Sequence, residues 1–136
     1  MIISVDFDGT LCRPNCYPEI RYDWDHLHLA RVLNLVQQNG HKVILNTCRE
    51  DRLRDIAVSF CKEILLFFPD LVNENCPDRI AEFGGDCRKI SADLYLDDKG
   101  VGYSIDRAMI RLYALVGGPR LNESISSMGG MTYVGE

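Results

Sequence analysis

Two aspartates separated by one residue are the part of this chain best suited to chemistry. Asp6 and Asp8 lie in the sequence DFDGT, residues 6–10, directly after an apolar run at residues 2–5. We expect that run to form a buried strand and Gly9 to allow a sharp turn after it. The two carboxylates would then lie at the mouth of a sheet, where open α/β folds bind their ligands.

Two later apolar segments are followed by polar groups that suit the same chemistry. Residues 42–46 are predicted to form a strand that is followed by Thr47. Residues 92–96 are predicted to form another strand, followed by Asp97 and Asp98. These three groups come from distant stretches of the chain, so their convergence at one place carries more information than any one of them alone.

The elements between these strands indicate how the groups are brought together. Apolar residues recur at helical spacing in three segments: 24–38, 47–68 and 105–116. Thr47 and Glu50 have the form of a capping box at the start of the second helix. Residues 70–73 are predicted to form a short strand and residues 75–88 a loop. Strands that alternate with helices indicate an α/β fold with a mainly parallel sheet, whose right-handed crossovers bring the carboxyl ends of the strands to one edge.

The converging side chains suit magnesium and phosphate. The carboxylates of Asp6, Asp8, Asp97 and Asp98 would repel one another, and a bound Mg²⁺, which prefers oxygen ligands, relieves that repulsion and neutralises a phosphate dianion. One carboxylate can attack phosphorus to give an aspartyl-phosphate, and a second can protonate the leaving oxygen and then activate water. Thr47, with the N–H groups of its helix start, can hold the phosphoryl oxygens.

These motifs resemble those of the haloacid dehalogenase superfamily. The resemblance rests on DFDGT, on the threonine at the strand end in VILNTCRE, and on LYLDDKG preceded by a lysine. It covers roughly residues 1–116 and implies a Rossmann-like three-layer α/β/α core and Mg²⁺-dependent phosphoryl hydrolysis. Residues 117–136, rich in Gly, Ser and Met, are predicted to be a loose tail.

The resemblance implies a role for each matching residue. Asp6 becomes the nucleophile, and Asp8 the general acid/base, with its backbone carbonyl on the metal. Thr47 binds the phosphoryl group. Asp97 and Asp98 hold magnesium, one of them directly and the other directly or through a water molecule.

The lysine of the fourth motif has two candidates. Lys89 lies just before the predicted last strand and is preferred as a catalytic residue, while Lys62 lies in a helix. Cys48 and Arg49, next to the threonine, are further candidates for binding phosphate. The pattern KISADLYLDDK also resembles a group of small members of the superfamily without a cap domain, and this resemblance makes Arg49 and the turn at residues 73–75 further candidates for the site.

The composition is that of an ordinary soluble domain. The chain has 136 residues, 46% hydrophobic and 26% charged, with a net charge of -5, so it has no basic field to gather nucleic acid. No apolar run reaches the length of a membrane span, and no export signal is recognised. Its six cysteines include no CxxC pair, so we expect reduced thiols, no zinc ribbon and a cytoplasmic location.

The sequence therefore predicts a capless, Mg²⁺-dependent phosphohydrolase that cleaves a phosphate monoester. The segments before the first long helix and between Pro69 and Lys89 are too short for a folded cap, so the site should be open. An open site suits a phosphorylated macromolecule or a nucleic acid end, or a small molecule if a second copy of the chain covers the mouth. The alternatives are a phosphate- and metal-binding regulatory module with little turnover, and a phosphotransferase.

Overall fold

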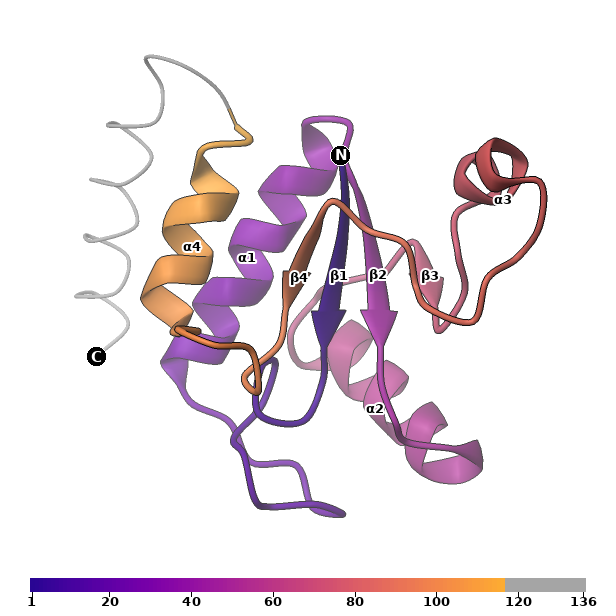
Figure 1. Ribbon diagram of the computed structural model, residues 1–136. Helices are drawn as coiled ribbons and strands as arrows, with labels where there is room; N and C mark the ends of the chain where they lie inside the picture. The colour runs from indigo at the N-terminus through magenta and orange to yellow at the C-terminus, as the bar shows by residue number, and fades with distance from the viewer. Residues whose placement is uncertain (117–136) are drawn as a thin grey trace.

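A sheet of four parallel strands lies at the centre of the fold, in the order β3-β2-β1-β4 (Figure 1). The computed structural model describes residues 1–116. The strands are β1 (Ile2–Asp6), β2 (Lys42–Asn46), β3 (Leu71–Val72) and β4 (Leu94–Leu96). The α/β fold with a parallel sheet that the sequence predicted is confirmed.

Helices cover both faces of this sheet and make three layers. The helices are α1 (Trp24–Gln38), α2 (Asp51–Glu63), α3 (Pro77–Phe83) and α4 (Ile105–Tyr113). Ile3 and Val5 of β1 belong to the main core cluster, which also holds buried residues of α1, α2 and α4. On the other face Ile44 packs with Cys76 and Ile90, which flank α3. Figure 1 shows α1 and α4 side by side on one side of the sheet and α3 on the other.

Helix α1 has the bounds that its apolar spacing predicted. Leu29, Val32, Leu33 and Val36 are fully buried, at the spacing of one helical face. The N–H of Asp23, the residue before the helix, donates to His26 Nδ1 at 2.9 Å and so satisfies a backbone donor at the helix start. The sequence therefore fixes this element through both its core face and its cap.

Helix α2 starts later and ends earlier than predicted. Thr47 does not open the helix, because its Oγ1 accepts the N–H of Arg49 at 3.1 Å in a local turn. The helix begins at Asp51 and ends at Glu63, well before Pro69. Leu65 and Phe67 beyond it are buried, and they continue the apolar pattern in a non-helical segment that the periodicity alone did not separate from the helix.

Helix α3 lies in the region that was predicted to be a loop. Pro77 occupies its first turn and Gly84 closes it in the left-handed conformation, with φ of 72°. None of its residues is buried, so it lacks the apolar face by which periodicity finds a helix. Pro77 and Gly84 were the two sequence features that could have indicated this helix.

The remaining bounds differ slightly from expectation. β4 starts two residues later than predicted, and α4 ends at Tyr113.

Across residues 1–116, no helix is long and apolar enough to cross a membrane. In that part of the chain, residues 7–23 hold none of these helices and strands, and the segment between Pro69 and Lys89 holds only β3 and α3. The predicted tail, residues 117–136, lies outside the described residues.

Candidate active site

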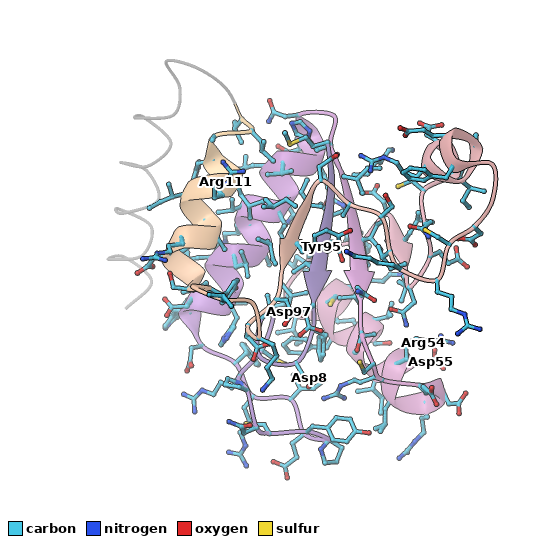
Figure 2. All side chains as sticks on the ribbon, in the orientation of Figure 1. Asp8, Arg54, Asp55, Tyr95, Asp97 and Arg111 are labelled. Carbon is cyan, nitrogen blue, oxygen red and sulfur yellow. The ribbon has the colours of Figure 1, made fainter. Side chains whose placement is uncertain are left out.

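Three carboxylates meet where β1 and β4 end. Asp6, Asp97 and Asp98 each offer one oxygen, and these oxygens all lie within 4.8 Å of one another. The register explains the meeting, because Val5 pairs with Leu96 and each of these two residues is followed in the chain by an aspartate. Figure 2 shows Asp97 at this carboxyl edge of the sheet, with Asp8 close by. The predicted convergence of Asp6 with the later pair is therefore present.

Two residues of the DFDGT sequence hold the second pair in place. Thr10 is buried, and its Oγ1 accepts the N–H of Asp98 at 3.1 Å. Gly9 has φ of 88°, and a Cβ there would collide with the Asp98 carboxylate, coming 2.8 Å from its Oδ1. Only glycine allows this close approach. Thr10 was not singled out from the sequence, although it belongs to the motif that was.

The electrostatics of the three carboxylates favour a bound cation. Burial, together with the negative charges of Asp97 and Asp98, raises the pKa of Asp6 to about 7. Asp98 Oδ1 is buried and has no hydrogen-bond partner among the described residues. A set of carboxylate oxygens with one orphaned oxygen fits a hard divalent cation such as Mg²⁺.

The side chain of Asp8 is not part of this carboxylate cluster. Arg49 binds it with two parallel hydrogen bonds: Nε donates to Oδ2 and Nη2 to Oδ1, each at 2.8 Å. Arg49 is 2% exposed, and its hydrogen bond to Asp8 is the main cause that raises its pKa. Arg49 therefore belongs to the site, and it contacts the proposed acid/base. The role of the Asp8 backbone carbonyl stays a prediction.

Arg49 also lies between two aromatic rings. Its Cζ is 5.1 Å from the centroid of the Phe7 ring and 5.0 Å from that of Tyr17. Its Nη1 is buried without a hydrogen-bond partner in residues 1–116. Tyr17 had no predicted role, and nothing in its local sequence marks it.

Thr47 is held at the end of β2 by Asn73, which follows β3. The N–H of Thr47 donates to Asn73 Oδ1 at 2.8 Å, and Asn73 Nδ2 donates to the carbonyl of Thr47 at 3.0 Å. Because α2 starts at Asp51, the backbone at Thr47 is not a helix start and supplies no helical N–H groups to a phosphate. Cys48, the neighbouring phosphate-binding candidate, is exposed.

The other two residues of the predicted turn have different surroundings. Asn75 is buried, and its side chain accepts the N–H of Ser91 at 2.6 Å and donates to the carbonyls of Cys87 and Lys89. It therefore holds the segment that leads into β4. Glu74 lines a cavity of about 420 Å³ with Arg54 and Asp55 of α2, which Figure 2 shows apart from Asp8 and Asp97.

The structure does not bring Lys89 to the carboxylates. Its Nζ lies 5.1 Å from the centroid of the Tyr95 ring, and Figure 2 shows Tyr95 farther from the carboxyl edge than Asp97. Within residues 1–116 neither Lys89 nor Lys62 forms an ion pair with a carboxylate. Lys89 precedes β4 and so enters the sheet from its amino edge, which explains its distance from the strand ends. Its assignment as the motif lysine stays a prediction.

Tyr103 is a further residue beside the carboxylates that sequence reasoning missed. Burial raises its pKa to about 12, and the negative charges of Asp98 and Asp6 act in the same direction. A tyrosine five positions after Asp98 carries no local signal of this kind.

A solved structure resembles the chain over most of its length. It is described as the structure of a conserved protein from Bacteroides thetaiotaomicron, with a TM-score of 0.67 and 33% sequence identity. The match covers 84% of this chain and 90% of the other. The chain belongs to the same family as this bacterial protein. No protein-family model matches the sequence, and a search of the curated proteins finds no match. Family membership supports the fold and does not assign an activity.

Proposed function

We propose that the protein is a Mg²⁺-dependent phosphohydrolase that cleaves a phosphate monoester through an aspartyl-phosphate. The observation that carries the proposal is the meeting of Asp6 with Asp97 and Asp98 within 4.8 Å at the carboxyl edge of a parallel sheet. The resemblance of the same three residues, with Asp8 and Thr47, to motifs of the haloacid dehalogenase superfamily supports it.

The carboxylates of Asp6, Asp97 and Asp98, with the backbone carbonyl of Asp8, would hold the Mg²⁺. When bound, the ion neutralises charge on the phosphate and lets an anionic nucleophile approach it. The Gly9 turn and the Thr10 hydroxyl keep Asp98 in position for this role.

The chemistry itself needs two carboxylates with different tasks. A carboxylate oxygen of Asp6 attacks phosphorus, and the bond between phosphorus and the ester oxygen breaks. Asp8 gives a proton to the departing oxygen and then takes one from the water that hydrolyses the aspartyl-phosphate. Because Arg49 donates to both oxygens of Asp8, Asp8 has to give up one of these hydrogen bonds and take up a proton from solvent before it can protonate the ester oxygen.

Residues after β2 would bind the phosphoryl oxygens. The hydroxyl of Thr47 and the backbone around Cys48 lie at the carboxyl edge, level with Asp6 through the pairing of Asp6 with Asn46. The partnerless Nη1 of Arg49 is the one guanidinium nitrogen that is not already used by Asp8.

Release of phosphate from a generic aryl phosphate tests the proposal. We expect release that needs Mg²⁺ and is lost, by more than about 10³-fold, in Asp6→Asn. Asp55→Asn, an exposed aspartate of α2, should keep full activity. Asp98→Asn should weaken Mg²⁺ binding measured by calorimetry. Full activity of Asp6→Asn would show that the nucleophile is wrongly assigned.

One observation favours a second candidate, a phosphate- and metal-binding module with little turnover. Asp8 is held by Arg49, and no lysine pairs with the carboxylate cluster in the part of the chain that the structure describes. Such a module would bind inorganic phosphate with Mg²⁺ and release none from esters. A phosphotransferase would instead use the same residues and pass the phosphoryl group to an added alcohol in competition with water.

A further inference from the structure

One aromatic side chain stands in solvent directly over the arginine that binds Asp8. Tyr17 is 59% exposed, although its ring lies 5.0 Å from the buried guanidinium of Arg49. One part of the ring therefore covers Arg49, and the rest is open to solvent. This arrangement presents an aromatic surface to solvent next to the site.

Contacts fix the guanidinium beneath Tyr17 and the base of the segment that carries it. Arg49 beneath it is fixed by two hydrogen bonds to Asp8 and by packing on Phe7. The segment that carries Tyr17 is closed at its base by an ion pair of Arg13 with Asp23 at 2.6 Å. A ring that rests on a fixed guanidinium offers a ligand a preformed surface for stacking, which limits the ordering cost of binding.

We propose that Tyr17 binds the leaving group of the substrate, and that this group carries a planar aromatic ring. The inference rests on the proposed function, in which the ester oxygen departs at Asp8. Two consecutive contacts, Asp8 to Arg49 and Arg49 to Tyr17, lead from that carboxylate to the exposed ring. A group attached to the departing oxygen therefore leaves the site over Tyr17. Aromatic rings are the groups that gain most from stacking on a tyrosine.

The charge of the chain narrows the substrate further. A net charge of -5 provides no field for a polyanion, which disfavours a nucleic acid end and favours a small phosphate ester. Two kinds of small ester carry a planar ring: aryl phosphates, with the ring on the ester oxygen, and nucleoside monophosphates, with a sugar between them. The shared chemistry is a stacking ring.

The test compares kcat/KM for phenyl phosphate, adenosine 5′-monophosphate and ethyl phosphate in matched variants. We expect Tyr17→Leu, which keeps an apolar cover on Arg49, to lower the preference for the ring-bearing ester over ethyl phosphate about tenfold. Tyr17→Phe should keep the preference. Tyr22→Leu, a partly exposed tyrosine of the same segment that packs on Phe60, is the control and should also keep it. If the preference for phenyl phosphate falls, the ring belongs to an aryl phosphate. If the preference for adenosine 5′-monophosphate falls, the ring belongs to a nucleoside monophosphate.

Other outcomes would overturn the inference. An equal loss for all three esters would show that Tyr17 only covers Arg49, and an unchanged preference would show that it does not contact the leaving group. A binding measurement separates this inference from the proposed function. With Mg²⁺ present, calorimetry should show phenylphosphonate binding about tenfold more tightly than methylphosphonate, and Tyr17→Leu should remove the difference. If the protein hydrolyses phosphate esters but binds the two phosphonates equally, the role of Tyr17 alone is overturned. If it binds phenylphosphonate more tightly but hydrolyses no ester, the proposed phosphohydrolase activity alone is overturned.

Discussion

Gly9 is the residue that lets the segment after β1 approach the Asp98 carboxylate. Its φ of 88° turns the chain after β1, and its missing side chain leaves room for the Asp98 carboxylate. Gly40, at the end of α1, has nearly the same φ of 87° but no atom within 4 Å of its potential Cβ. The two glycines therefore separate the cost of a left-handed backbone from the cost of a close approach.

We predict that Gly9→Ala and Gly40→Ala both lower the free energy of unfolding, by about 1 kcal/mol for the backbone conformation alone. Only Gly9→Ala should also displace Asp98 and abolish Mg²⁺ binding, measured by calorimetry. Unchanged Mg²⁺ binding in Gly9→Ala would show that the Asp98 carboxylate does not need its observed position to hold the ion.

The acidic residues show what sequence can predict at this scale. The positions of Asp6, Asp97 and Asp98 follow from the backbone, because each comes at or just after the end of a strand whose direction the alternating pattern predicts. The direction of the Asp8 side chain does not follow from it. That direction depends on Arg49, a buried arginine whose partner lies 41 positions away and which local pattern cannot pair.

At the scale of elements, Asn73 connects the ends of β2 and β3 beside the site. It makes two hydrogen bonds to the backbone of Thr47 and itself has a left-handed backbone, with φ of 54°. Asn15 has a similar φ of 62°, and its side chain makes no hydrogen bond in the part of the chain described here. Replacing each by glycine changes the backbone preference in the same way and removes the hydrogen bonds only at Asn73.

We predict that Asn73→Gly lowers the free energy of unfolding by about 2 kcal/mol more than Asn15→Gly, since each lost hydrogen bond costs about 1 kcal/mol. Urea denaturation measures the difference. Asn73→Gly should also raise KM for the phosphate ester, because Thr47 is no longer fixed. Equal stability of the two variants would mean that water replaces Asn73 without cost.

The elements themselves were predictable to the extent that they bury a periodic apolar face. Helix α1 has such a face and its bounds were correct, whereas α3 has no buried residue and was missed. The start of α2 was misplaced because Thr47 and Glu50 fit a capping pattern, and the hydroxyl instead closes a turn at Arg49. A competing local hydrogen bond of this kind is not visible in the sequence.

At the scale of the whole molecule, the carboxylate cluster makes stability depend on pH when no metal is bound. Burial and the neighbouring carboxylates raise the pKa of Asp6 from 3.8 to about 7, so between these values the folded state binds more protons than the unfolded state. The contribution of Asp6 to the free energy of unfolding is therefore most favourable below about pH 4. It falls as the pH rises from there through about 7. Asp23 and Asp93 have lowered pKa values and titrate below this window.

We predict that, in the presence of a chelator, the free energy of unfolding falls by about 2 kcal/mol between about pH 4 and pH 8 relative to Asp6→Asn. The expected change is smaller than full burial would give, because solvent screens part of the repulsion. Mg²⁺ should remove most of the fall by binding the ionised cluster. Parallel pH profiles of the parent protein and Asp6→Asn would contradict the raised pKa.

The pairing of β1 with β4 also has a consequence for how the protein is made. Thr10 and Asp98, which touch through a hydrogen bond, are 88 residues apart in the chain, and β4 is a three-residue strand at the edge of the sheet. A growing polypeptide therefore cannot assemble the cluster until nearly all of residues 1–116 have been synthesised. Short edge strands are also among the first parts of a fold to open. A cation bound between the ends of β1 and β4 would stabilise the pairing of these two strands. When the cation is lost, we expect unfolding to begin with β4.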